Sequence, residues 1–249
     1  MTNKFYAPGE QRAARVNDLF NTIAPRYDLI NDLQSFGMHR VWKRRLLRLA
    51  NGQPGERALD LCCGTGDVAL GLARTGVAAV GLDFSAPMLE VARRRLAAER
   101  RSGRLADGLA IEFMQGDAQQ IPFPDNTFDV ITISYGLRNL ADWELGLREM
   151  QRVAKPGGRL MVLDFGKPEN AAWRAVYFAY LRYLVPVLGR IFCGDADTHG
   201  YILESLLNYA AQKGVAQKMG ALGLEDVRIV NLMGGVMSIN LGKKPDAAA

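Results

Sequence analysis

The chain contains 249 residues, of which 49% are hydrophobic and 23% are charged, with a formal net charge of +5. These values are those of an ordinary globular protein with one α/β domain, and the length excludes two full domains. The three cysteines lack metal-ligand spacing, the N-terminus lacks an apolar signal core, and no apolar run reaches about 18 residues, so we expect a cytoplasmic protein with no metal site and no membrane-spanning helix.

Residues 1–52 are expected to form a helical segment that covers the active site. Apolar residues at helical spacing predict one helix over residues 12–23 and a second over residues 38–50. Between them, residues 24–32 are interrupted by a proline and predict a connector. The remaining residues, 53–249, are expected to form the catalytic domain.

The connector is rich in polar side chains. Tyr27, Asp28 and Asn31 lie close together in it and are candidate substrate contacts. Side chains of the Asx type also cap helices at such places, and this alternative role stays open.

A glycine turn follows the first predicted strand, which covers residues 58–63. Gly64, Thr65 and Gly66 stand where that strand gives way to a helix, and glycine there lets a ligand approach the main chain. The N-terminus of the helix offers unpaired N–H groups to a polar ligand. The turn is therefore a candidate cofactor site, although turns of this kind also occur without a ligand.

A second strand over residues 77–82 runs into Asp83, roughly 20 residues beyond the glycine turn, where nucleotide-binding sheets place a carboxylate that accepts both ribose hydroxyls. The third glycine of a dinucleotide site is missing, because Ala69 stands there. Two further carboxylates, Asp60 and Asp67, would repel phosphates and suit a cationic ligand. S-adenosylmethionine carries both a ribose and a sulfonium, and it fits this pattern.

Strands and helices continue to alternate after Asp83. Further helices are predicted over residues 85–101 and 143–154, and further strands over residues 110–115, 128–134 and 159–165. This order indicates a parallel sheet with a ligand crevice at the carboxyl ends of its strands. The polar side chains expected along that edge are Thr65, Asp83, Asp117 and Ser134. Asp117 could hold the exocyclic amine of an adenine or cap the next turn.

The last third of the chain contains an aromatic-rich insertion at about residues 168–200. Its segment 171–192 has three readings: a buried helix pair, a lid over an apolar substrate, or an element at the membrane surface. A polar loop with His199, a helix over residues 201–222 and a hairpin of strands 225–232 and 236–242 are expected to follow.

Three groups of motifs resemble the ubiquinone/menaquinone biosynthesis C-methyltransferase family: residues 20–32 with 35–42, residues 123–129 with 133–140, and residues 155–160. The resemblance implies a Rossmann-like class I methyltransferase fold, with a seven-stranded mostly parallel sheet, a C-terminal antiparallel hairpin and helices on both faces. It also implies methyl transfer from S-adenosylmethionine to a ring carbon of a lipophilic prenylated quinol. The cofactor contacts that it suggests are Thr65, Asp83, Asp117 with Ala118, and Ser134, beside the candidates Gly64, Gly66 and Asp60.

Carbon methylation of a phenol needs a base and groups that favour the phenolate. We expect Arg138 and Asn139 to orient a water or the phenol, with Asp117 paired to Arg138. His199 and Tyr201 are the rival acid–base candidates. The chain departs from the family pattern around these two residues, which leaves the preference for ring and tail open.

The overall look of the motifs favours demethylmenaquinol over a ubiquinone precursor as the acceptor. An RNA methyltransferase, a nicotinamide oxidoreductase and a non-catalytic cofactor-binding protein are the competing hypotheses. The missing glycine argues against the second, and no RNA-binding module is visible, so we expect no nucleic-acid partner. The sequence leaves open a homodimer and a peripheral position on the inner face of the membrane.

Overall fold

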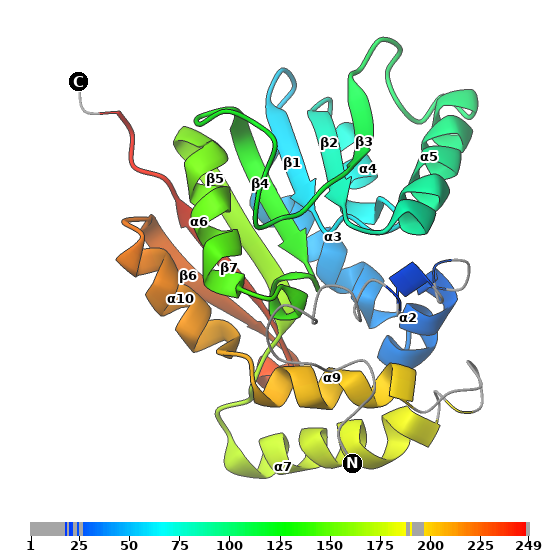
Figure 1. The fold of residues 1–249 in the computed structure, drawn as a ribbon, viewed down its shortest axis with the longest axis vertical. Helices are drawn as coiled ribbons and strands as arrows, with labels where there is room; N and C mark the ends of the chain where they lie inside the picture. Colours follow the sequence, from blue (N-terminus) through cyan, green and yellow to red (C-terminus); the bar gives the residue numbers. More distant parts are fainter. Residues whose placement is uncertain are drawn as a thin grey trace.

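The computed structural model describes residues 18, 20, 21, 24, 27–187, 190 and 197–247, with the backbone alone for residues 197–201. Its centre is a seven-stranded sheet in the order β3-β2-β1-β4-β5-β7-β6 (Figure 1). The first five strands pair in parallel, and β7 is antiparallel to both β5 and β6. The strands are β1 (Arg57–Leu61), β2 (Ala78–Asp83), β3 (Ile111–Gln115), β4 (Phe128–Ser134), β5 (Ala154–Phe165), β6 (Glu225–Leu232) and β7 (Met237–Lys243).

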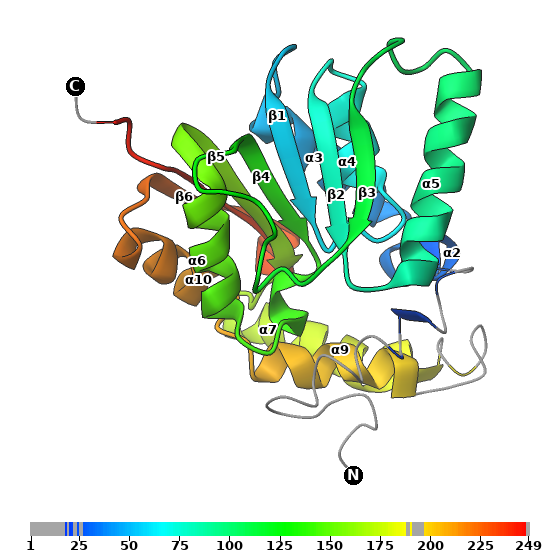
Figure 2. The ribbon, with the colours of Figure 1, turned by 45° about the horizontal axis from the view of Figure 1, so that its top comes forward.

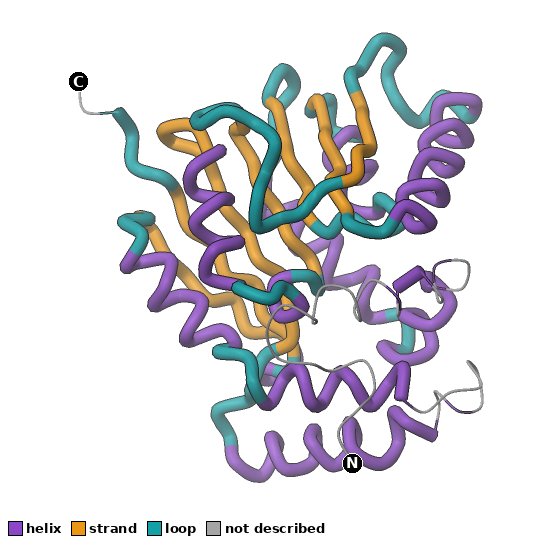
Figure 3. The backbone as a smooth tube through the Cα atoms, in the orientation of Figure 1, coloured by secondary structure: helices purple, strands orange, loops and turns teal. Residues whose placement is uncertain are grey.

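Helices cover both faces of the sheet, as Figure 3 shows. On one face pack α3 (Met38–Ala50), α4 (Asp67–Ala73) and α5 (Ala86–Arg101), and on the other α6 (Trp143–Val153) and α10 (Ala211–Ala221). Because neighbouring residues of a strand point to opposite faces, Leu59 packs with the second helix layer and Ala58 with the first. The predicted seven-stranded fold, with its antiparallel hairpin and two helix layers, is confirmed.

A third group of helices lies beyond the carboxyl ends of the parallel strands. It contains α2 (Tyr27–Ser35), α7 (Ala171–Ala179) with the π-helical turn η3 (Tyr180–Leu184), and α9 (Asp197–Leu207), and the last three run side by side in both ribbon views (Figures 1 and 2). The Tyr180 hydroxyl donates to the carbonyl oxygen of Gln34 at 2.9 Å, which links η3 to α2. Within the described part of the chain, no helix is long and apolar enough to cross a bilayer.

Three predicted boundaries are wrong. The connector expected at residues 24–32 contains the start of α2, because Pro25 precedes that helix rather than interrupting it. The predicted helix over residues 201–222 is two helices, α9 and α10, and Ala211 at the start of the second has φ of +51°. Residues 197–200, expected as a loop, already belong to α9.

The fifth strand also begins earlier than predicted. The Pro-Gly-Gly segment after Lys155 lies inside β5, where Gly157 takes up a left-handed φ of +75° and the pairing with β4 shifts register. Most of the helix expected over residues 12–23 lies outside the described residues.

Candidate functional site

A cavity of about 780 Å³, measured to its open mouth, lies at the carboxyl ends of the first four strands. Each strand brings one of the predicted residues to its wall: Gly64 follows β1, Asp83 ends β2, Asp117 follows β3 and Ser134 ends β4. Ala118 also lines it. Four strands in a parallel sheet thus assemble the predicted edge, and we call this space the first cavity.

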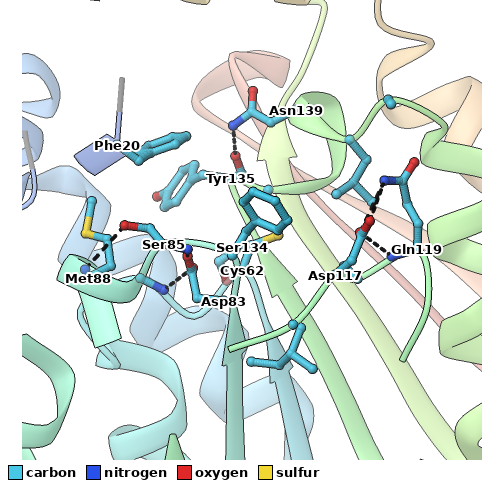
Figure 4. Close-up of a pocket in the computed structure, with 18 of the residues that line it drawn as sticks. Phe20, Cys62, Asp83, Ser85, Met88, Asp117, Gln119, Ser134, Tyr135 and Asn139 are labelled. Carbon is cyan, nitrogen blue, oxygen red and sulfur yellow. Dashed lines mark hydrogen bonds between the residues drawn. The ribbon is translucent and has the colours of Figure 1, made fainter. Parts of the chain in front are cut away.

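Asp83 is fixed in place by the backbone around it. One carboxylate oxygen accepts the Gly64 N–H and the other accepts the Ser85 N–H, both at 2.8 Å, as Figure 4 shows for the second contact. Burial raises the pKa of Asp83, and these N–H groups oppose that rise. Each oxygen retains a second lone pair, so the carboxylate can still accept two hydroxyl groups from a ligand.

Two further polar groups of this cavity come from the ends of β3 and β4. Asp117 accepts the backbone N–H of Gln119 at 2.8 Å, so it does form the turn cap that was the alternative to ligand binding, and it still lines the cavity. The Ser134 hydroxyl is buried and has no hydrogen-bond partner among the described residues. An unpaired buried hydroxyl is a site where a polar ligand atom is expected.

Three predicted cofactor contacts do not line either cavity. Asp60 is buried under the sheet edge, where it accepts the Ala69 N–H at 3.2 Å and the Thr132 hydroxyl at 2.7 Å. Thr65 donates to Asp28 at 2.9 Å, and Gly66, with φ of +84°, begins α4 against the side chain of Phe113. These three residues support the glycine turn but are not part of either cavity wall.

The negative charge that Asp67 was expected to offer a cationic ligand is neutralised within the protein. Its carboxylate accepts the Lys43 ammonium at 2.7 Å and the Arg95 guanidinium. Burial raises the pKa of Asp67, but the two cations outweigh burial and hold it below its ordinary value. Asp67 lies outside the cavity wall and joins three helices, so this part of the sequence argument is wrong.

A second cavity, of about 960 Å³, lies between the sheet and the helices beyond its edge. Its wall is mostly aromatic and aliphatic, and it is built from α2, α3, η3 and the ends of β5 and β7. Side chains that line it are Ile30, Trp42, Phe165, Tyr177, Leu181, Val185, Ile202 and Met237. A cavity of this composition suits an apolar ligand with a few polar atoms.

The two cavities share three aromatic residues. Phe20, Tyr27 and Tyr135 line both, and the rings of Phe20 and Tyr27 meet edge to face at 6.0 Å. Tyr135 follows Ser134 with φ of +61°, a conformation that costs a non-glycine residue energy and so points to function. Figure 4 shows its ring next to that of Phe20. Ligands in the two cavities would meet at this aromatic junction.

Arg138 lies in the wall of the second cavity and is paired with Asp164, not with Asp117 as predicted. Its Nε lies 3.2 Å from the Asp164 carboxylate, and its Nη1 donates to Asn139 at 3.0 Å and to Ser205 at 2.6 Å. The guanidinium also stacks over the Phe165 ring at 4.8 Å. Asn139 lines the first cavity and donates to the carbonyl oxygen of Tyr135 at 3.0 Å.

The three predicted substrate residues separate into two groups. Tyr27 lines both cavities, and Asn31 lines the second, where its Nδ2 is buried without a partner among the described residues. Asp28 instead accepts hydrogen bonds from Thr65 and Arg95, which hold α2 over the glycine turn. The side chains of His199 and Tyr201 lie outside the described residues.

Sequence reasoning missed several residues of the two walls. Tyr135 directly follows a predicted strand end, so its position was a usable signal. Ser85, whose hydroxyl donates to Asn21 at 2.6 Å, and Met88 entered the prediction only as part of a helix start. His39, Trp42, Tyr177 and Tyr180 come from distant segments, and their meeting in the second cavity depends on tertiary packing.

Comparison with known proteins relates this geometry to one family. The model of the ubiE/COQ5 methyltransferase family matches residues 9–244. The chain is 41% identical over 241 residues to the ubiquinone/menaquinone biosynthesis C-methyltransferase UbiE of Cellvibrio japonicus, covering 96% of this chain and 94% of that protein. It is 40% identical over 240 residues to a demethylmenaquinone methyltransferase of Desulfitobacterium hafniense, covering 95% and 92%.

Solved structures share the fold at low sequence identity. A SAM-dependent methyltransferase from Aquifex aeolicus superposes with a TM-score of 0.56 at 20% identity, covering 81% of this chain and 88% of that one. A likeness of this degree shows that the two chains have the same architecture.

Proposed function

The chain belongs to the ubiE/COQ5 methyltransferase family, and we propose from this premise that it transfers a methyl group from S-adenosylmethionine to a ring carbon of a prenylated quinol, with demethylmenaquinol as the acceptor. The observation that carries the proposal is the pair of cavities joined at Phe20, Tyr27 and Tyr135. One cavity has the polar groups for the donor and the other has the apolar wall for the acceptor. The reaction needs both within contact of each other.

The residues of the first cavity fit the donor. Asp83 keeps two free lone pairs for the ribose hydroxyls, and the unpaired hydroxyl of Ser134 awaits a polar partner. Asp117 and Ala118 of the cavity wall would hold the adenine, and both carboxylate oxygens of Asp117 accept hydrogen bonds from Gln119. When bound, S-adenosylmethionine supplies a methyl group on a positively charged sulfur, and the rings at the aromatic junction suit such a cation.

The second cavity fits an aromatic acceptor with an isoprenoid tail. Trp42, Phe165 and Tyr177 supply apolar and aromatic surface for a quinol ring. A polyanion such as RNA, with a charge on every phosphate, is poorly suited to this wall, because most of its side chains are aromatic or aliphatic. The wall therefore favours a quinol over a nucleic acid.

Arg138 is proposed to stabilise the phenolate form of the acceptor. A guanidinium does not give up its proton in a protein, so it cannot act as the base. A buried cation beside the phenol instead lowers the energy of the charged form, and Asp164, Asn139 and Ser205 hold it in place.

The outer side of α7 and η3 is proposed to rest on the membrane surface, where the acceptor resides. Exposed apolar side chains along this segment are Trp173, Val176, Tyr183, Leu184 and Val187. Three exposed arginines, Arg174, Arg182 and Arg190, accompany them and suit anionic headgroups. Tyr177, Leu181 and Val185 of the same segment line the second cavity, so the isoprenoid tail has an apolar surface leading outward.

The proposal is tested by incubating the purified protein with methyl-labelled S-adenosylmethionine and one acceptor at a time. We expect label on a ring carbon of demethylmenaquinol and equimolar S-adenosylhomocysteine. Transfer to a demethylated ubiquinone precursor alone would reassign the acceptor, since relatives named for both pathways are similar to this chain. Label on oxygen, or no transfer to either quinol, would contradict the proposed function.

A further inference from the structure

The wall of the second cavity contains a buried histidine. His39, in the first turn of α3, is 3% exposed and lines this cavity beside Asn31, Ser35 and Trp42. Its Nε2 lies 2.8 Å from the carboxylate of Asp32 in α2. Arg40 donates to the same carboxylate from Nε at 2.8 Å and from Nη2 at 2.6 Å.

The Asp32 contact fixes which imidazole nitrogen carries the proton. The Arg40 guanidinium holds the pKa of Asp32 well below its usual range, so this carboxyl is ionised. A carboxylate only accepts hydrogen bonds, so Nε2 is the protonated nitrogen and Nδ1 carries the lone pair. Nδ1 is buried and has no hydrogen-bond partner among the described residues.

The other ionisable groups among the described residues of this wall cannot accept a proton at neutral pH. Among the described residues that line it there is no carboxylate, and Arg138 is permanently charged. Burial raises the pKa of Tyr27, Tyr135 and Tyr177, so these phenols stay protonated and can only donate to an anion. Within the described wall, the neutral imidazole of His39 is the group suited to receive a proton.

We propose that His39, oriented by Asp32, is the general base that removes the phenolic proton of the acceptor. This inference rests on the proposed function, because it needs a phenol in the second cavity. The arrangement is an acid–base pair in which the carboxylate is a positioning residue and the imidazole touches the substrate.

Methyl transfer begins with removal of the phenolic proton. The phenolic O–H bond breaks and its proton passes to Nδ1 of His39, leaving a phenolate that Arg138 stabilises. Electron density from the phenolate oxygen flows to the ortho carbon, which forms a bond to the methyl group while the sulfur–carbon bond breaks and its electron pair remains on sulfur. The methylated carbon then loses its hydrogen as a proton to water, and imidazolium returns its proton to the oxygen. One proton is released overall, and His39 is neutral again.

Charged groups around His39 determine where it titrates. Burial lowers the pKa of His39, the hydrogen bond that its Nε2 donates to Asp32 opposes this, and the positive charge of Lys43 acts with burial. Asp67 of α4 faces Lys43, and the phenols of Tyr27 and Tyr135 and the Arg138–Asp164 pair complete the surroundings. The imidazole is therefore neutral at neutral pH, as a base must be.

The chain has two histidines, His39 and His199, so two matched variants separate them. His39→Gln keeps an N–H group for Asp32 but has no basic nitrogen, whereas His199→Gln removes the other imidazole. Methyl transfer to demethylmenaquinol is measured for both variants and the wild type from about pH 5.5 to about 9, on either side of an ordinary histidine pKa. Calorimetry with S-adenosylmethionine and a melting curve are recorded for each.

We expect H39Q to lower kcat by about 100- to 10,000-fold while the Kd of S-adenosylmethionine is unchanged. The wild-type rate falls at acid pH as His39 becomes protonated, and H39Q replaces that plateau with a continuous rise as hydroxide takes over. Asp32→Asn, which withdraws the negative charge that favours imidazolium, moves the acid limb to lower pH, and a purely structural contact would not. If H39Q fails to fold, the pH profile of Asp32→Asn tests the assignment, and an acid limb that does not move contradicts it.

Two results would contradict His39 as the base and leave the proposed function standing. One is an H39Q protein with kcat within threefold of wild type, and the other is an acid limb that disappears in H199Q instead. A wild type that methylates no quinol would remove the proposed function and this base together. The wild-type reaction therefore distinguishes failure of the proposed function from failure of the His39 assignment.

Discussion

Replacing Asp83 by asparagine is expected to weaken donor binding far more than folding. Both carboxylate oxygens already accept a backbone N–H at 2.8 Å, so the amide NH2 of asparagine must face one of these donors. The ribose hydroxyls also exchange a charged acceptor for a neutral one. A hydrogen bond to a charged group is worth about 1.5–3 kcal/mol and a neutral one about 1 kcal/mol, so two hydroxyls lose roughly 1–4 kcal/mol.

This loss corresponds to a Kd for S-adenosylmethionine that is roughly 5- to 900-fold higher, measured by calorimetry. Asp125→Asn is the matched control, because its carboxyl is 67% exposed, pairs with Arg152 at 2.8 Å and precedes β4 at the opposite edge of the sheet. We expect its Kd to stay within twofold of wild type. A Kd for D83N within threefold of wild type, with an unchanged melting curve, would refute the role of Asp83.

Three further predictions concern charge, pH and membrane contact. Arg138→Met leaves the buried Asp164 carboxylate without its cation and is expected to lower the free energy of unfolding in urea by about 3–5 kcal/mol. Adding Asp164→Asn should restore most of that stability, while the turnover of the double variant stays about 100-fold below wild type. Restored turnover would contradict a phenolate-stabilising role for Arg138. Burial raises the pKa of Asp60 from 3.8 to about 7. Between these two pH values the folded carboxyl keeps its proton while the unfolded one loses it, so the contribution of Asp60 to stability falls as the pH rises. Asparagine does not titrate, so the free energy of unfolding of Asp60→Asn, minus that of wild type, should increase by roughly 4 kcal/mol between about pH 4 and 7. A difference that does not change with pH would refute this pKa. Replacing Tyr183 and Leu184, which are 68% and 45% exposed, by aspartate should reduce sedimentation with anionic vesicles at least tenfold without changing the Kd of the donor, whereas unaltered sedimentation would exclude this surface.

The cofactor edge could be predicted because it depends on local order. Strands that alternate with helices must place their carboxyl ends along one edge, so Asp83, Asp117 and Ser134 could be located from their position after a strand. The same reasoning assigned Asp60 and Asp67 to the ligand. It could not foresee that Thr132, Lys43 and Arg95, from other parts of the chain, would satisfy these carboxylates.

The second cavity could not be predicted, for a related reason. Its wall combines α2, α3 and η3 with the ends of β5 and β7, and no sequence pattern states how such segments pack. Arg138 lies in the wall of the second cavity, and its ion pair is with Asp164 of β5 rather than with the predicted Asp117. Tertiary packing, not periodicity, thus selects the groups that line this cavity.

The most direct test of the central claim is a crystal structure of the protein with S-adenosylhomocysteine and demethylmenaquinol. We predict the ribose on Asp83, the quinol ring in the second cavity against Trp42 and Tyr177, and the sulfur facing the acceptor carbon across the junction of Phe20, Tyr27 and Tyr135. A quinol ring bound outside that cavity, or a ribose remote from Asp83, would contradict the account.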